Sequence, residues 1–109
     1  MHEVLRAARN REKKLIAFLQ DLIRIQSLST EEGPVIERIR QEMHGAAFDE
    51  VRVDRLGNII GRIGQGSHTI AMDAHIDTVA VNDVAAWEVP PFAGEVRDGQ
   101  VYGRGAVDQ

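Results

Sequence analysis

The sequence contains no cysteine. Without cysteine there is no disulfide framework, no paired-thiol redox motif and no metal site built on thiolates. Any metal that these 109 residues bind must therefore be held by histidine nitrogens and carboxylate oxygens.

Long apolar runs and an excess of positive charge are absent too. The apolar stretches are short, such as residues 15–19, whereas a membrane span needs roughly 18 to 20 residues. The 13 lysines and arginines are outnumbered by 17 acidic residues, giving a net charge of −4, which disfavours phosphate backbones and anionic membranes. Acidic residues are interspersed among the basic residues at the N-terminus, and no uninterrupted apolar segment with a small-residue cleavage site follows them, so these residues do not resemble a secretory signal. We therefore expect a cytoplasmic protein with neither nucleic-acid nor membrane partners.

The length and the composition suit one small folded domain. Hydrophobic residues make up 43% and charged residues 28%, which are ordinary values for a globular chain with a buried core. Only two of the ten glycines precede residue 55, so we expect helices in the first half and strands with turns in the second.

Apolar residues recur every three or four positions in the first half, which predicts two amphipathic helices. The first covers about residues 3–26, and Ser29 or Thr30 caps the second, which ends near Gly45. The expected buried positions are Leu15, Ile16, Leu19, Leu22 and Ile23 in the first helix and Val35, Ile36, Ile39 and Met43 in the second.

From Val51 onward the pattern is that of β-structure. Alternating residues predict a hairpin over residues 51–63, and an Asp-Gly turn predicts another over residues 94–102. Between them, residues 69–75 predict a third strand that is apolar on both faces at positions 70–72, as in the centre of a sheet.

Two titratable side chains, His75 and Asp77, stand where this predicted central strand ends. Ligands of α/β sheets bind at such an edge, and residues two apart on an extended chain project to the same side. Asp77 can then accept from one ring nitrogen of His75 and leave the other to a metal. The alternative is a solvated strand end without a ligand.

A second candidate ligand is Asp108, which follows Gly103 and Gly105. Two glycines in three positions allow the backbone to approach a site closely, and a carboxylate presented there can coordinate a cation. The alternative is an ordinary loop residue after a glycine-rich turn.

These two segments also carry a family resemblance. Residues 71–79, Ala-Met-Asp-Ala-His-Ile-Asp-Thr-Val, resemble the HxDTV segment of the di-zinc metallohydrolases that include acetylornithine deacetylase, succinyl-diaminopimelate desuccinylase and aminoacylase. Residues 87–108 resemble the same family's W…PF…G…DG…YGRG..D stretch in order and spacing. Within the family, the sequence of residues 71–79 together with Asp108-Gln109 is most similar to the hydrolases linked to selenium metabolism. The fold implied is α/β, the N-terminal part of a zinc-exopeptidase-like α/β/α catalytic domain.

The resemblance implies a chemistry for three residues. His75 would ligate one zinc, and Asp108 would bridge two zincs. Asp77 would be a catalytic residue that orients His75. Cobalt or manganese could replace zinc. Water on zinc has a pKa of about 7, which suits attack on an amide carbonyl. The implied substrate is an N-acyl amino acid or a small peptide, and the full-length protein is expected to be a homodimer.

The site is incomplete in this chain. A catalytic zinc takes about three protein ligands, and only His75 and Asp108 match the family's ligands here. The family's remaining ligands and its general-base glutamate belong to sequence after Gln109. We therefore expect residues 1–109 to be a truncated part of the catalytic domain and inactive alone. Acidic and histidine residues assigned to helix ends or the surface are Glu31, Glu32, His2, His44 and His68.

Two alternatives remain at this point. The chain can be a binding or interaction module that keeps the family's architecture without its catalysis. It can also assemble with a separate chain that carries the other ligands.

Overall fold

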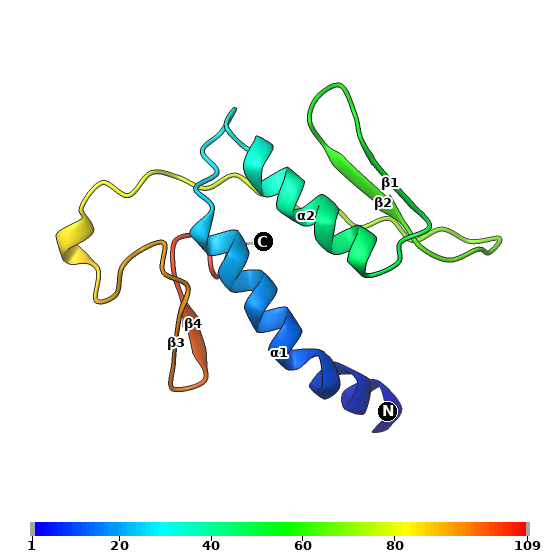
Figure 1. Cartoon of the computed structure of the whole chain (residues 1–109), viewed down its shortest axis with the longest axis horizontal. Coiled ribbons are helices and arrows are strands. Elements are labelled where there is room, and N and C mark those ends of the chain that lie inside the picture. Colours follow the sequence, from blue (N-terminus) through cyan, green and yellow to red (C-terminus); the bar gives the residue numbers. More distant parts are fainter. Residues whose placement is uncertain (1, 109) are drawn as a thin grey trace.

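A computed structural model describes residues 2–108 as two helices followed by two separate β-hairpins (Figure 1). The predicted order, helices first and β-structure second, is confirmed. The elements are α1 (His2–Arg24), α2 (Gly33–Gly45), β1 (Glu50–Val53), β2 (Ile59–Arg62), the short 3-10 helix η1 (Val84–Ala86), β3 (Glu95–Arg97) and β4 (Gln100–Tyr102).

The contact between the helices is made by the C-terminal half of α1. Ile23 of α1 and Val35 of α2 are only 4% and 3% exposed. Leu15 was expected in the buried stripe, but it is 67% exposed. Figure 1 shows that the first turns of α1 project away from the rest of the chain.

An ionic cluster ties the two helices together. The Arg38 guanidinium of α2 lies 3.0 Å from the Asp21 carboxylate of α1 and 2.9 Å from Glu42. It also lies 4.8 Å from the centroid of the Phe18 ring, a cation–π distance. One guanidinium thus contacts both helices and fixes their relative placement.

The predicted cap of α2 was wrong. The N-cap residue is Glu32, and no side chain caps the helix there. Thr30 takes a left-handed conformation with φ 76°, and its backbone N–H donates to the Glu32 carboxylate. The Ser29 hydroxyl donates to Asp77 instead, far along the sequence.

Both predicted hairpins are present. In the first, Val51 pairs with Gly61 across an antiparallel ladder. In the second, Val96 pairs with Val101. Asp98 and Gly99 in the second turn both have positive φ, 51° and 77°, as the tight turns of two-residue hairpins require.

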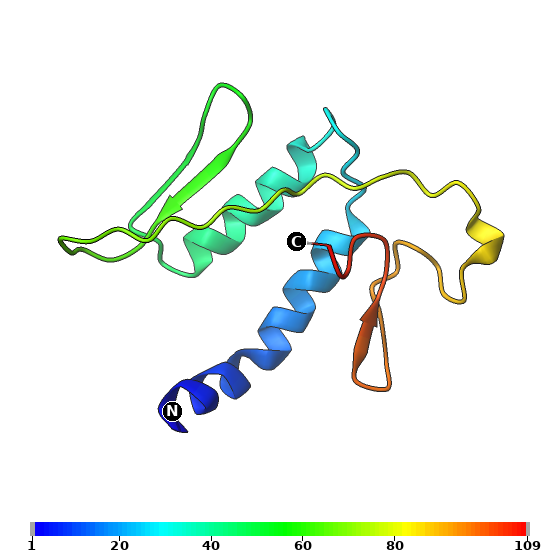
Figure 2. The same ribbon diagram turned by 180° about the vertical axis from the view of Figure 1, so that it is seen from behind.

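The predicted third strand over residues 69–75 was wrong. The segment is irregular, and the side chains of Ile70 and Met72 are 89% and 91% exposed. A strand needs a neighbour to satisfy its backbone groups, and each sheet in the described part of the chain has only two strands. Figures 1 and 2 show this stretch as an extended connection that passes α2 on its way to η1.

The chain is open rather than compact. Its radius of gyration is 15.8 Å, whereas a compact domain of this size has about 13 Å. Among residues 2–108, the buried hydrophobic core consists of Ile23, Val35 and Val89. The expected buried core is therefore small, and much apolar surface remains uncovered.

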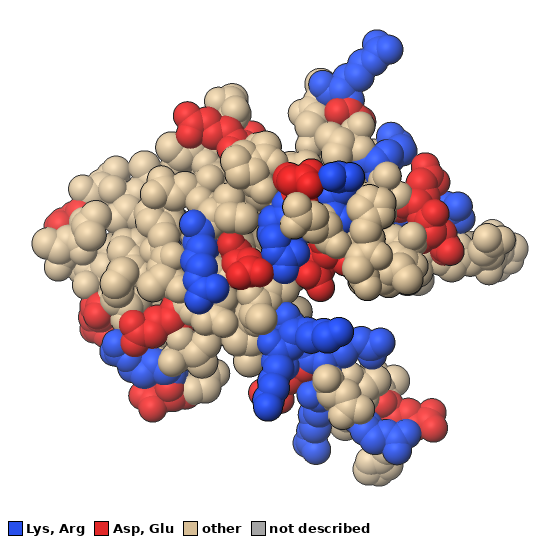
Figure 3. Space-filling view, viewed as in Figure 1, with Lys and Arg blue, Asp and Glu red and all other residues tan. Residues whose placement is uncertain are grey.

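Charged side chains are unevenly spread over this surface. Lysines and arginines gather along the projecting half of α1, while the end of the molecule that carries η1 is mostly neither acidic nor basic (Figure 3). No helix in the described residues has the length and apolar character needed to cross a membrane.

Candidate metal centre

The structure brings together the three residues that the sequence singled out. His75 Nδ1 lies 3.2 Å from Asp77 Oδ1, and His75 Nε2 lies 3.2 Å from Asp108 Oδ1. The imidazole therefore sits between two carboxylates, one from its own segment and one 33 positions away. Their predicted roles as ligands and orienting group stay predictions, but their proximity is a structural fact.

The segment that carries His75 and Asp77 is held by the loop after α1. Ser27, only 2% exposed, donates its hydroxyl to the Ile76 carbonyl at 2.7 Å. Its own carbonyl accepts from the Thr78 N–H, also at 2.7 Å. Two hydrogen bonds from one buried residue thus place the backbone on either side of Asp77, without a neighbouring strand.

Asp108 is brought to the site by close packing at two glycines. A Cβ on Gly103 would lie 2.3 Å from Cγ2 of Ile23. Gly105 has φ 78°, and a Cβ there would lie 2.7 Å from Thr78 Cγ2. The predicted close approach of the backbone at these glycines is confirmed, and it places the turn that ends at Asp108 against α1 and the 76–78 segment.

The charges of the site reinforce one another. The hydrogen bond that the His75 ring donates to Asp108 raises the pKa of His75. Burial lowers this pKa, and Asp77 raises it further. The Ser29 hydroxyl lowers the pKa of Asp77, opposed by burial and helped by His75. The folded chain thus favours a protonated His75 beside an ionised Asp77.

The donor atoms fit one edge of a zinc coordination shell. Two ligands at tetrahedral zinc, each about 2.0–2.1 Å from the ion, lie about 3.3 Å apart. The 3.2 Å between His75 Nε2 and Asp108 Oδ1 is close to that value. Among residues 2–108 no group of three or more histidine, aspartate or glutamate side chains is placed to hold a metal. The described residues therefore bring together fewer candidate ligands than the roughly three that a catalytic zinc needs.

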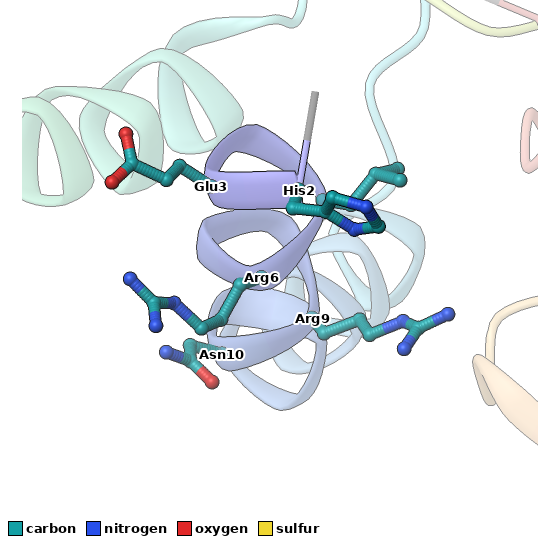
Figure 4. A pocket seen from close by; sticks show the side chains of 6 residues that line it. His2, Glu3, Arg6, Arg9 and Asn10 are labelled. Carbon is teal, nitrogen blue, oxygen red and sulfur yellow. The ribbon is translucent and has the colours of Figure 1, made fainter.

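The three residues line a pocket of about 90 Å³. Its apolar wall comes from both helices, including Ile23 and Val35. A larger hollow of about 650 Å³ lies at the start of α1. Figure 4 shows its side chains, among them His2, Glu3 and Arg6, pointing outward from one helix instead of converging. The smaller pocket is therefore the candidate site, because His75, Asp77 and Asp108 converge on it.

Arg104 also lines this pocket, and the sequence analysis did not single it out. Its guanidinium lies 5.0 Å from the centroid of the Trp87 ring. Its backbone N–H donates to the Pro91 carbonyl at 2.7 Å. Trp87 is half-buried.

Other residues considered from the sequence lie elsewhere. His2, His44 and His68 are exposed, as predicted. Glu31 and Glu32, which were expected in the first turn of the second helix, both precede α2, and Glu32 is its N-cap residue. The expected truncation point, Gln109, lies outside the described residues. Two residues that support the site, Ser27 and Ser29, were missed. A Ser-x-Ser pair before a helix resembles a helix cap, and nothing in the local sequence indicates that its partners lie some 50 positions away.

Comparison with known proteins gives the class. Residues 71–109 match the model of peptidase family M20/M25/M40. The matched segment contains His75, Asp77 and Asp108. The resemblance inferred from the two motifs is thus confirmed.

Individual relatives agree with the family match over most of the chain. The chain is 40% identical over 106 residues, 97% of its length, to "Uncharacterized protein YgeY" of Escherichia coli (strain K12). It is 42% identical over 97 residues, 85% of its length, to succinyl-diaminopimelate desuccinylase of Cereibacter sphaeroides (strain ATCC 17029). The desuccinylase of Rhodospirillum centenum is 35% identical over 100 residues, also 85% of the chain. The chain spans 26% of the length of each of these relatives.

Proposed function

We propose that residues 1–109 are the N-terminal part of a catalytic domain that hydrolyses amide bonds in N-acyl amino acids or small peptides with zinc. His75 ligates one zinc through Nε2, Asp108 bridges two, and cobalt or manganese can replace them. The observation that carries the proposal is the placement of His75 Nε2 and Asp108 Oδ1, 3.2 Å apart. The family match over residues 71–109 supports hydrolysis as the reaction class.

Each residue of the chain has a distinct task in this proposal. Asp77 accepts the Nδ1 proton of His75, so that Nε2 can exchange the proton it shares with Asp108 for the metal. Asp108 supplies the negative charge that a pair of divalent cations needs between them. When bound, zinc polarises the amide carbonyl and lowers the pKa of a water molecule to about 7.

The proposal includes an incomplete site. Two ligands are too few for a catalytic zinc, and the chain spans 26% of the length of its desuccinylase relatives. The general base and the remaining ligands would come from the rest of a longer protein, which we expect to be a homodimer. The cytoplasmic location stays a prediction.

The first expected result concerns metal binding by the chain itself. Zinc should bind weakly, and His75→Ala or Asp108→Asn should each lower the affinity by more than about tenfold, since each removes one of two ligands. Binding should weaken in acid, because a proton competes with zinc for Nε2. The raised pKa of His75 moves this loss to higher pH than for an ordinary histidine. Competition with a chromogenic chelator measures the affinities.

The matched control is His68→Ala. His68 is also exposed, and its ring Nδ1 lies 3.0 Å from the Ser67 hydroxyl, but no carboxylate faces it among the hydrogen bonds of the described residues. Its replacement should leave zinc binding unchanged. Equal losses in the His68 and His75 variants would overturn the proposed site.

The second expected result concerns turnover. Incubated with zinc and a panel of N-acyl amino acids, the chain alone should release no free amino acid, because the general base is absent from it. Amine release detected by a fluorogenic reagent is the measurement. Hydrolysis that disappears in His75→Ala would contradict the expected inactivity while supporting the site itself.

A further inference from the structure

We propose that Ser29 is a positioning residue that sets the orientation of the His75 ring by holding the Asp77 carboxylate. The inference rests on the proposed function, in which His75 Nε2 faces the metal. The residues form one chain of contacts, from the Ser29 hydroxyl through the Asp77 carboxylate to the imidazole and on to Asp108.

The geometry uses the two oxygens of Asp77 separately. The Ser29 hydroxyl donates to Oδ2 at 2.5 Å, while Oδ1 lies 3.2 Å from His75 Nδ1. His75 Nδ1 is also 3.1 Å from the Asp77 backbone carbonyl. With Oδ2 bound to Ser29, the carboxylate cannot turn about its terminal bond without breaking that hydrogen bond, so Oδ1 stays on the ring nitrogen.

The backbone keeps Ser29 at the required distance. Two positions earlier, Ser27 is bonded to the Ile76 carbonyl and the Thr78 N–H, the residues that flank Asp77. The loop after α1 and the segment of the site are therefore fixed to each other on both sides of the Ser29–Asp77 contact. Such support beyond the ligands is what keeps a metal-binding histidine in one tautomer and orientation.

Ser29 does not cap α2. The cap of α2 is Glu32, and Ser29 is exposed, so its hydroxyl contributes little to the stability of the fold. A buried hydroxyl, by contrast, would be expected both to stabilise the fold and to position the site. The loss of Ser29 should therefore change the site and leave the helices intact.

The test compares Ser29→Ala with Ser29→Thr and Ser67→Ala in the full chain. Ser29→Ala should weaken zinc binding about tenfold, the lower end of the range for supporting hydrogen bonds at metal sites. Ser29→Thr keeps a hydroxyl and should retain the affinity. Ser67→Ala removes an exposed hydroxyl beside a different histidine and should have no effect.

A second readout follows the ring without metal. In the metal-free chain, nitrogen chemical shifts of His75 report whether Nδ1 keeps its proton at a fixed pH. Ser29→Ala should reduce the Nδ1-protonated share, and Ser29→Thr should restore it. A change in stability alone would not produce this pattern.

A double-mutant comparison isolates the route through Asp77. In an Asp77→Ala background, Ser29→Ala should cause no further loss of zinc affinity, because the link between Ser29 and the ring is already removed. Additive losses, or an unchanged ring in Ser29→Ala, would overturn the role of Ser29. Absence of His75-dependent zinc binding in the unmodified chain would instead overturn the proposed function, and the ring shifts would still decide the positioning of His75.

Discussion

Gly103→Ala is expected to lower the free energy of unfolding by about 1–3 kcal/mol, the usual effect of overpacking. The added Cβ would lie 2.3 Å from Ile23 Cγ2 and 3.1 Å from the Pro91 carbonyl oxygen. Ile23 belongs to the small buried core and cannot move aside freely. Thermal or urea unfolding followed by circular dichroism measures the change.

Gly66→Ala is the matched control. The nearest atom to its added Cβ is the His68 carbonyl oxygen at 3.9 Å, an ordinary contact, and Gly66 has no positive φ. Its unfolding midpoint should stay close to that of the unmodified chain. Equal destabilisation at the two positions would show that the packing of Gly103 against α1 has no special importance.

Ser27→Ala is the second change with a large expected effect, about 1–3 kcal/mol of lost unfolding free energy. Ser27 is 2% exposed, and removal of its hydroxyl leaves the Ile76 carbonyl without that donor in a place where water reaches it poorly. The same unfolding measurement applies. Hydrogen exchange at the Thr78 amide, which donates to the Ser27 carbonyl, should become faster.

Ser29→Ala provides the contrast for this prediction. The two serines are two positions apart, but only Ser27 is buried. Ser29→Ala should affect zinc binding with little change in stability, while Ser27→Ala should affect both. If both variants lost the same stability and the same affinity, the division between an anchoring serine and a positioning serine would be wrong.

The elements predicted correctly are those stabilised by neighbours in the sequence. Both helices carry apolar residues at helical spacing, and both hairpins have turn residues between paired strands only a few positions apart. The turn at Asp98 and Gly99 is an example, since its residue types alone specify positive φ. Such information is present in any short window of the sequence.

Residues 69–75 show where that information ends. Their apolar pattern correctly describes residues able to form a central strand, but a strand exists only when other strands bind its backbone. No described residue pairs with this segment in a sheet, so Ile70 and Met72 lie in the open. A pattern in the sequence identifies a capacity for pairing and not the presence of the partner.

The three residues that meet at the site were singled out from the sequence, whereas the serines that hold them in place were missed. His75, Asp77 and Asp108 have side chains whose chemistry is recognisable, and the glycines before Asp108 signal close packing. Serine hydroxyls serve as caps, surface groups or supports with equal ease. Only the tertiary contacts with Ile76 and Asp77 distinguish these roles for Ser27 and Ser29.

The long separation between the residues that build the site has a kinetic consequence. The helices and hairpins close over short loops, whereas the Ser27–Ile76 link spans 49 positions and the His75–Asp108 contact spans 33. Contacts between distant residues form late in folding, because the chain must lose more loop entropy before they are made. The helices and hairpins should therefore form early, and the imidazole should meet its second carboxylate among the last events on the folding pathway.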